Sequence, residues 1–253
     1  MNILFTLCGR AGSKGYKNKN LRDFLGFPLS YYSLSAIELY IMNNSTINVD
    51  IVLNTDSQEL IRQVLQQNRL TVHVIERKPE LCGDLVPKGA VITDCLIKMG
   101  TSLNKQYNMV VDLDITSPLR TRNDIENIIN EKVRNSSTDV IFSVTPSRRN
   151  PYFNMVKKTN HGFERVVQSH FTTRQEAPEI FDMNASLYAY EPVFLEAGKP
   201  IFDGTCGIIT MHDTGVLDID SEEDFLLMQV VARYFYENHH DYGQIYNNLC
   251  TWL

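Results

Sequence analysis

A glycine-rich, basic loop near the start of the chain has the composition of an anion-binding site. It runs from Cys8 to Asn20 and contains three glycines and several cationic side chains but no acidic residue. Glycine lets backbone N–H groups approach a bound anion closely, and the cations neutralise its charge. Because the whole chain carries a net charge of −6, this local positive charge indicates a polyphosphate site. The spacing matches neither the dinucleotide-binding G-x-G-x-x-G motif nor the P-loop, which weakens both interpretations.

Two carboxylates near the C-terminus, Asp218 and Asp220, are spaced to hold a hard metal ion. Side chains at i and i+2 of an extended segment point the same way, so both can reach one cation. Ser221 already supplies a cap for the helix expected next, so neither aspartate is needed for that task. Together with a polyphosphate loop, the pair predicts Mg²⁺, with Mn²⁺ as the alternative.

Two further groups of polar residues have a functional and a structural interpretation. Asp114 follows a buried strand and could bind a base, a sugar or a metal, but the Thr-Ser-Pro after it is equally typical of a turn. For Asp112 the structural interpretation is favoured. Arg174 has the chemistry to clamp an anionic sugar, although its spacing alone favours an ion-paired surface.

These groups depend on a regular alternation of strands and helices over the first 145 residues. Strand-like apolar runs occur at 3–8, 49–54, 72–76, 109–113 and 140–144. Helical apolar spacing separates them, and Thr121-x-x-Asp124 and Ser221-x-x-Asp224 are typical of helix starts. The pattern predicts an α/β fold, a mostly parallel twisted sheet with helices on both faces. Ligands of such sheets bind beyond the carboxyl ends of the strands, where the basic loop and Asp114 would lie.

The alternation breaks between residues 146 and 190. Tyr152–Val156 and Asn184–Tyr190 alternate like exposed or edge strands, so we expect this stretch to leave the sheet as a lid, a dimer arm or both. The sheet resumes at Gly207–Met211 and is followed by a last helix. We therefore expect a single domain over residues 1–253 with an inserted excursion at 146–190, and we assign no function to 239–253.

Composition excludes several classes of protein. Hydrophobic residues make up 43% of the chain, enough for a sizeable core, but no apolar run is long enough to span a membrane. The net charge of −6 argues against a nucleic-acid binder. Five cysteines without C-x-x-C spacing predict neither a disulfide framework nor a zinc site. They indicate buried thiols in a reducing environment, hence a cytoplasmic protein.

Taken together and in order, these segments resemble the acylneuraminate cytidylyltransferase family, the CMP-sialic acid synthetases. The resemblance covers about residues 1–230 and rests on Gly9–Gly15 with Lys19–Asn20, Asn54–Asp56, Arg77 with Pro79–Leu81 and Asp84, Thr116–Arg120, Arg174–Gln175, Asn184 with Tyr188, and Asp218–Asp220. Other segments look most like the branch that activates legionaminic acid, namely Cys8, Asp112–Asp114, Asn150–Val156 and Asp182–Ser186.

The resemblance implies a nucleotide-diphosphosugar-transferase fold, a homodimer, and transfer of CMP from CTP to a nine-carbon 2-keto-3-deoxy sugar acid with release of pyrophosphate. It assigns nucleotide binding to Arg10, Ser13, Lys14, Lys19, Asn20 and Arg77. It assigns binding of the sugar acid to Asp114, Arg174, Gln175, Asn184 and Tyr188. Catalytic roles are implied for Arg10, Lys19 and Arg174, and Mg²⁺ binding for Asp218 and Asp220.

Departures from the family pattern narrow the range of sugar acids that we expect as substrates. Asp114 stands where sialate enzymes often have Gln, and Asp182-Met183 replaces an Arg-Pro found in some of them. We therefore expect a legionaminic-type acid in preference to neuraminic acid. The segment Leu85–Lys88 lacks the hydroxyl residues of many members, so it is assigned no nucleotide contact. Two alternatives remain open, a glycosyltransferase that uses Asp112-x-Asp114 on a nucleotide sugar and a CTP-sensing module without turnover.

Overall fold

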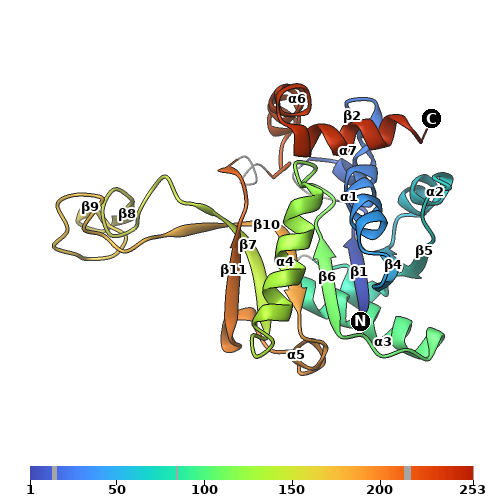
Figure 1. Ribbon diagram of the computed structural model, residues 1–253. Coiled ribbons are helices and arrows are strands. Elements are labelled where there is room, and N and C mark those ends of the chain that lie inside the picture. Colours follow the sequence, from blue (N-terminus) through green and yellow to red (C-terminus); the bar gives the residue numbers. More distant parts are fainter. Residues whose placement is uncertain (13–15, 84, 214–217, 253) are drawn as a thin grey trace.

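The computed structural model describes residues 1–12, 16–83, 85–213 and 218–252, and among them a seven-stranded sheet forms the centre (Figure 1). The strand order is β11-β7-β10-β6-β1-β4-β5. The bounds are β1 Asn2–Cys8, β4 Asn48–Thr55, β5 Val72–Glu76, β6 Met109–Leu113, β7 Val140–Pro146, β10 Phe181–Tyr190 and β11 Cys206–Thr210. Within this sheet β10 is antiparallel to both its neighbours, and the other pairs are parallel. The predicted mostly parallel α/β sheet is confirmed.

Helices cover both faces of the sheet, as the buried side chains of β1 show. Ile3, Phe5 and Leu7 enter one core cluster, whereas Leu4 enters a second cluster on the opposite face. The first cluster lies under α1 (Leu29–Asn43), α2 (Gln58–Gln66), α4 (Arg122–Arg134), α6 (Glu222–Asn238) and α7 (His240–Cys250). The second lies under α3 (Lys88–Leu103) and α5 (Pro192–Glu196). Each strand therefore presents alternate residues to two helical layers.

Three helices, α2, α4 and α6, begin at residues whose side chains cap the first turn. Thr121 begins α4 and Ser221 begins α6 with reciprocal capping boxes, as the sequence predicts. Ser57 caps α2 by accepting a hydrogen bond from the backbone N–H of Leu60. Short 3₁₀ turns, η1 (Lys19–Leu21), η2 (Pro79–Leu81) and η3 (Ile201–Asp203), and the small β2 (Asp23–Phe24) and β3 (Phe27–Pro28) pair complete this part of the fold.

The excursion leaves the sheet at the end of β7 and returns in β10, and Figure 1 shows it projecting far from the helical layers. It carries a hairpin, β8 (Val156–Thr159) with β9 (Gly162–Arg165). Two expectations were wrong. Tyr152–Val156 consists of turns up to the first residue of β8, because Asn150 holds the turn with its side-chain and backbone carbonyls. Asn184–Tyr190 belongs to an interior strand between β7 and β6, so the part outside the sheet ends at residue 180.

The register of β10 shifts between Met183 and Tyr188, where the strand bulges. Ala185 within the bulge has a φ of 53°, a left-handed conformation that side chains other than glycine rarely adopt. The segment 239–253 contains α7, which packs against α1 and α6. No helix in the described part of the chain is both long and apolar enough to span a membrane.

Candidate active site

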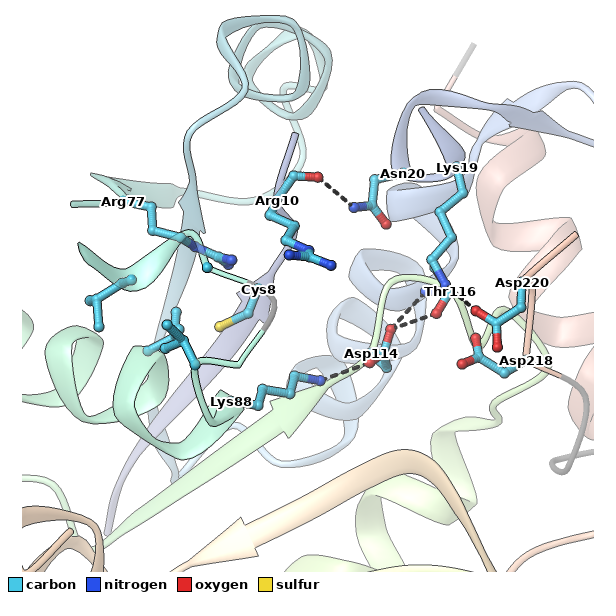
Figure 2. Close-up of a pocket in the computed structure, with 14 residues that line it drawn as sticks. Cys8, Arg10, Lys19, Asn20, Arg77, Lys88, Asp114, Thr116, Asp218 and Asp220 are labelled. Atoms are coloured by element: carbon cyan, nitrogen blue, oxygen red, sulfur yellow. Dashed lines mark hydrogen bonds and ion pairs between the residues drawn. The ribbon is translucent and has the colours of Figure 1, made fainter. Parts of the chain in front are cut away.

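A pocket of about 410 Å³ opens at the carboxyl ends of β1, β5 and β6, the edge at which the sequence places a ligand. Side chains from five separate segments line it, and Figure 2 shows them converging. The charged and polar lining residues are Arg10, Lys19, Asn20, Arg77, Lys88, Asp114, Thr116, Asp218 and Asp220. Cys8, Leu81, Gly83, Val86 and Val91 complete the wall.

The basic loop after β1 is joined to the segment before α6. The Nζ atom of Lys19 donates to the carbonyl oxygen of Ile219 at 2.7 Å and to Oδ1 of Asp220 at 2.9 Å. Asn20 Nδ2 donates to the carbonyl oxygen of Arg10 at 3.2 Å, which orders the backbone from which the Arg10 side chain extends into the pocket (Figure 2). Ser13 and Lys14, also assigned to the nucleotide, lie outside the described residues.

Two glycines of this loop, Gly9 and Gly12, are also constrained by the structure around them. A Cβ on Gly9 would lie 2.8 Å from Leu60 Cδ2 and 3.0 Å from Ile115 Cδ1, so any larger residue there would have to displace these packed side chains. Gly12 has a φ of +71°, which glycine adopts without strain. The constraint at Gly9 therefore comes from packing against α2 and the segment after β6, and that at Gly12 from the backbone conformation of the loop.

Arg77 is fixed on the opposite side of the loop by Asn54, the residue at which β4 nears its end. Its Nε donates to Asn54 Oδ1 at 2.8 Å and its Nη2 to the Asn54 carbonyl oxygen at 3.0 Å. These two contacts hold the guanidinium plane while leaving it in the pocket wall (Figure 2). A held arginine is well suited to bind an anionic or polar ligand bidentately.

Asp218 and Asp220 both face the pocket, and Ile219 between them is fully buried, as their i, i+2 spacing predicts. Asp218 Oδ1 is buried and has no hydrogen-bond partner among the described residues. Burial raises the pKa of Asp218, and the nearby charges of Asp114 and Asp220 raise it further. An unpartnered buried carboxylate oxygen next to a second carboxylate fits a divalent cation.

The charges around the pocket also suit a bound divalent cation. Among the described residues, four cationic side chains (Arg10, Lys19, Arg77 and Lys88) and three carboxylates (Asp114, Asp218 and Asp220) line it, a difference of one positive charge. The charge of these described residues does not balance a polyphosphate, and a cation bound with the ligand would add to the neutralisation. The described residues contain no cluster of three or more His, Cys, Asp or Glu side chains suited to a metal. Further ligands to an ion would have to come from the bound molecule and water.

Lys88 is a pocket residue that sequence reasoning missed. Its Nζ lies 2.7 Å from Asp112 Oδ2 and 2.8 Å from Asp114 Oδ2. Asp112 is fully buried and also accepts a hydrogen bond from Thr6 Oγ1 at 2.7 Å, so its predicted structural role is confirmed. Asp112 is thus enclosed by protein groups, which argues against the glycosyltransferase alternative. The sequence did contain one indication of this contact. Lys88 is in the first turn of a helix, where the helix dipole disfavours a lysine unless acidic groups offset its charge.

Arg120 holds the loop after β6 in place, and its burial was also not foreseen. Only 1% of the residue is exposed. Nη2 donates to the carbonyl oxygens of Asp114 (2.9 Å) and Ser186 (2.7 Å), Nε to Ser186 Oγ (3.1 Å), and Nη1 to Ser33 Oγ (3.0 Å). The side chain therefore ties the Asp114 turn to α1 and to the bulge of β10.

We expect Arg120→Met to lower the free energy of unfolding by about 3 kcal/mol or more, because several buried acceptors lose their donor at once. Urea denaturation measures this change. The matched control is Arg134→Met at the exposed end of α4, which should change stability by less than about 0.5 kcal/mol. Equal small effects of both substitutions would contradict the anchoring role of Arg120.

Four residues assigned to the sugar acid do not line this pocket. Arg174 lies in the excursion, where its Nη2 donates to the carbonyl oxygen of Ser147 at 2.6 Å. Gln175 is exposed beside it. Asn184 is buried and accepts from Ser143 Oγ at 2.5 Å, and Tyr188 stacks on Tyr190 with 5.9 Å between ring centroids. Their contact with a ligand remains a prediction.

Comparison with known proteins gives concordant matches. The model of the cytidylyltransferase family matches residues 7–225. The CMP-N,N'-diacetyllegionaminic acid synthase of Campylobacter jejuni is 36% identical over 227 residues, covering 90% of this chain and 93% of the relative. Post-translational flagellin modification protein B of Campylobacter coli is 32% identical, covering 91% and 95%. A solved CMP:2-keto-3-deoxy-manno-octonic acid synthetase complexed with CTP has a TM-score of 0.66 at 12% identity, over 92% of this chain and 99% of the other, which shows a shared fold.

Proposed function

The chain belongs to the cytidylyltransferase family and is a nucleotidyltransferase, and on that premise we propose that it activates a nine-carbon sugar acid with CTP. The products would be the CMP-sugar and pyrophosphate. The observation that carries the proposal is the single pocket wall that joins Arg10, Lys19 and Arg77 to the paired carboxylates Asp218 and Asp220. A chain with this pocket and 36% identity to a CMP-N,N'-diacetyllegionaminic acid synthase suits an acylated nonulosonic acid as its substrate.

In the proposed reaction the anomeric C2 hydroxyl attacks the α-phosphorus of CTP in line. A new P–O bond forms to the sugar while the bond to the β-phosphate oxygen breaks, and the hydroxyl proton is released. Arg10 and Lys19, with Ser13 and Lys14 of the same loop, would bind the triphosphate and stabilise the charge on the leaving pyrophosphate. Catalysis would come mainly from positioning the two substrates and from this fixed positive charge.

Asn20 and Arg77 would orient the nucleotide from opposite sides of the pocket. Asp218 and Asp220 would hold Mg²⁺, or Mn²⁺ as the alternative. When bound, such an ion supplies Lewis-acid neutralisation of phosphoryl oxygens. Lys19 already pairs with Asp220, so this carboxylate is oriented toward the phosphate-binding loop.

For the sugar acid we propose a legionaminic-type substrate. Met183 is exposed near the start of β10, and Asp182 precedes it, so this end of the strand is apolar and acidic. An apolar surface tolerates a methyl group and gains nothing from a hydroxyl, with discrimination of about 10–200-fold per small group. Arg174, Gln175, Asn184 and Tyr188 would contribute from the excursion and β10.

The experiment that tests this function measures pyrophosphate release from CTP with a panel of sugar acids. We expect release that requires a sugar acid, with a higher kcat/KM for a legionaminic-type acid than for neuraminic acid at one CTP and Mg²⁺ concentration. A preference for neuraminic acid would reject the sugar assignment alone. CTP binding without release for any sugar acid would reject the enzymatic function. The expectation of buried thiols was wrong for most of the five cysteines, because only Cys95 is buried and Cys206 and Cys250 are exposed. All five are free thiols, which suits the reducing cytoplasm that we propose as the compartment.

We also propose that the excursion mediates a homodimer. Phe163 at the hairpin is 73% exposed and Val156 is 62% exposed, whereas Tyr152 packs on Phe171. We expect light scattering to give a dimer at micromolar concentration, and Phe163→Asp to shift it toward monomer by placing charge in the interface. Val193→Asp on α5, equally exposed, should leave the dimer intact. A monomeric parent protein would reject this proposal.

A further inference from the structure

The ammonium group of Lys88 and the carboxylate of Asp114 lie side by side at the pocket wall. Lys88 has three N–H donors; it donates one to Asp114 Oδ2 at 2.8 Å and forms an ion pair with Asp112 Oδ2 at 2.7 Å. The Lys88 side chain is 33% exposed and that of Asp114 25% exposed. Lys88 therefore keeps donor capacity, and Asp114 keeps acceptor capacity, for a molecule in the pocket.

The charges of Lys88 and Asp114 set which of the two donates and which accepts a hydrogen bond. Burial opposes ionisation of Asp114, but the charge and hydrogen bond of Lys88 and the two hydrogen bonds from Thr116 hold its pKa well below the usual range. Burial likewise opposes the charge of Lys88, but Asp112 and Asp114 raise its pKa well above the usual range. At neutral pH Lys88 is always a donor and Asp114 always an acceptor.

The charge of the cluster limits what it can bind. One ammonium against the carboxylates of Asp112 and Asp114 leaves one net negative charge, which repels phosphate and carboxylate groups. A neutral group with one donor and one acceptor fits instead, and an amide N–H next to its C=O has this pattern. In Figure 2 Lys88 and Asp114 lie across the pocket from Arg10 and Arg77.

The pair is also fixed to the strand that enters from the excursion. The backbone N–H of Asp114 donates to the carbonyl oxygen of Ser186 at 3.1 Å, and Arg120 bridges the carbonyl oxygens of the same two residues. Asp114 is thus positioned relative to the β10 bulge, at the side of the pocket where β6 ends. The cations suited to phosphate come from the loops after β1 and β5 instead.

We propose that Lys88 and Asp114 act as one donor–acceptor pair that recognises an acylamido group of the sugar acid. The free N–H of Lys88 donates to the acyl carbonyl oxygen, and the Asp114 carboxylate accepts from the amide N–H. Lys88 is then a specificity-determining residue, and the ion pair with the buried Asp112 holds its ammonium group in position. This inference rests on the proposed function, because it names the group of the sugar acid that the same pocket recognises.

The test compares a diacylated legionaminic-type acid with analogues in which a hydroxyl replaces one acylamido group. We expect the parent protein to prefer the diacylated acid over one of these analogues by about 10²-fold in kcat/KM. The double variant Lys88→Met/Asp112→Asn removes the donor and the buried charge of Asp112, while Asp114 keeps its two hydrogen bonds from Thr116 and its partial exposure. It should reduce the preference to less than about 10-fold through the KM for the sugar acid, with the KM for CTP changed by less than about 3-fold.

Two further variants keep the result interpretable. Lys98→Met removes an ion-paired lysine from the same helix, remote from the pocket lining, and should leave the preference unchanged. Lys88→Arg keeps the charge but moves the donors, and should also reduce the preference. A preference retained in both Lys88 variants, or a KM for CTP that rises as much as that for the sugar acid, would overturn the inference. Absence of turnover with every sugar acid would instead reject the proposed function.

Discussion

Arg10→Ala is expected to lower kcat by about 10²-fold or more while the protein stays folded. The side chain extends into the pocket from the second residue after β1, and its Nη1 lies 3.4 Å from the carbonyl oxygen of Cys82. If the pocket holds a triphosphate, this guanidinium is placed to meet charge that grows as pyrophosphate leaves. An interaction that strengthens in the transition state affects kcat more than KM.

Steady-state kinetics with saturating CTP and sugar acid measures this effect, and thermal unfolding checks the fold. Arg62→Ala is the control, because Arg62 is exposed on α2 and pairs only with Glu59 among the described residues. It should change kcat by less than about 2-fold. Turnover near that of the parent in folded Arg10→Ala protein would show that Arg10 does not serve the reaction.

Asp218→Asn is expected to lower kcat by about 10²-fold or more at moderate Mg²⁺ and to raise the Mg²⁺ concentration needed for half-maximal activity. The substitution keeps the size of a side chain whose buried oxygen has no partner among the described residues, but it removes the charge that attracts a cation. Asp220→Asn should act in the same direction, and it should also release Lys19 from its ion pair.

Titration of activity with Mg²⁺ and with Mn²⁺ measures both variants. Asp213→Asn is the matched control, since Asp213 is in the same segment but pairs with Arg148 and is absent from the pocket lining. The metal assignment would be wrong if Asp218→Asn and Asp220→Asn showed the rate and the metal dependence of the parent protein. The same result would leave the nucleotide-binding role of Arg10 untouched.

The features that the sequence predicted correctly depend on local patterns. β5 and β6 have the predicted bounds, and the capping boxes at Thr121 and Ser221 start their helices, because strand periodicity and caps are set by residues a few positions apart. The place of the pocket was also predictable, since parallel strands bring their carboxyl ends to one edge.

The features that were missed depend on contacts between distant segments. The alternating pattern of Asn184–Tyr190 is the same for an edge strand and for the interior strand it forms, and only pairing with β6 and β7 distinguishes them. The contact of Lys88 with Asp112 and Asp114 requires the start of α3 to lie over the end of β6. The burial of Arg120 likewise follows from acceptors on α1 and β10.

The interior position of β10 has a consequence for how this chain folds. β6 and β7 follow one another in sequence, yet they are not neighbours in the sheet, and each pairs with β10. Until residues 181–190 have been synthesised, both strands therefore present an unpaired edge, which is the kind of surface that promotes aggregation. During translation β6 and β7 cannot be joined in the sheet until β10, which follows the whole excursion, has been synthesised. Such non-local strand pairing is slow. The central sheet of a nascent chain closes only when this strand inserts, so a chain truncated before residue 181 should depend on chaperones to stay in solution.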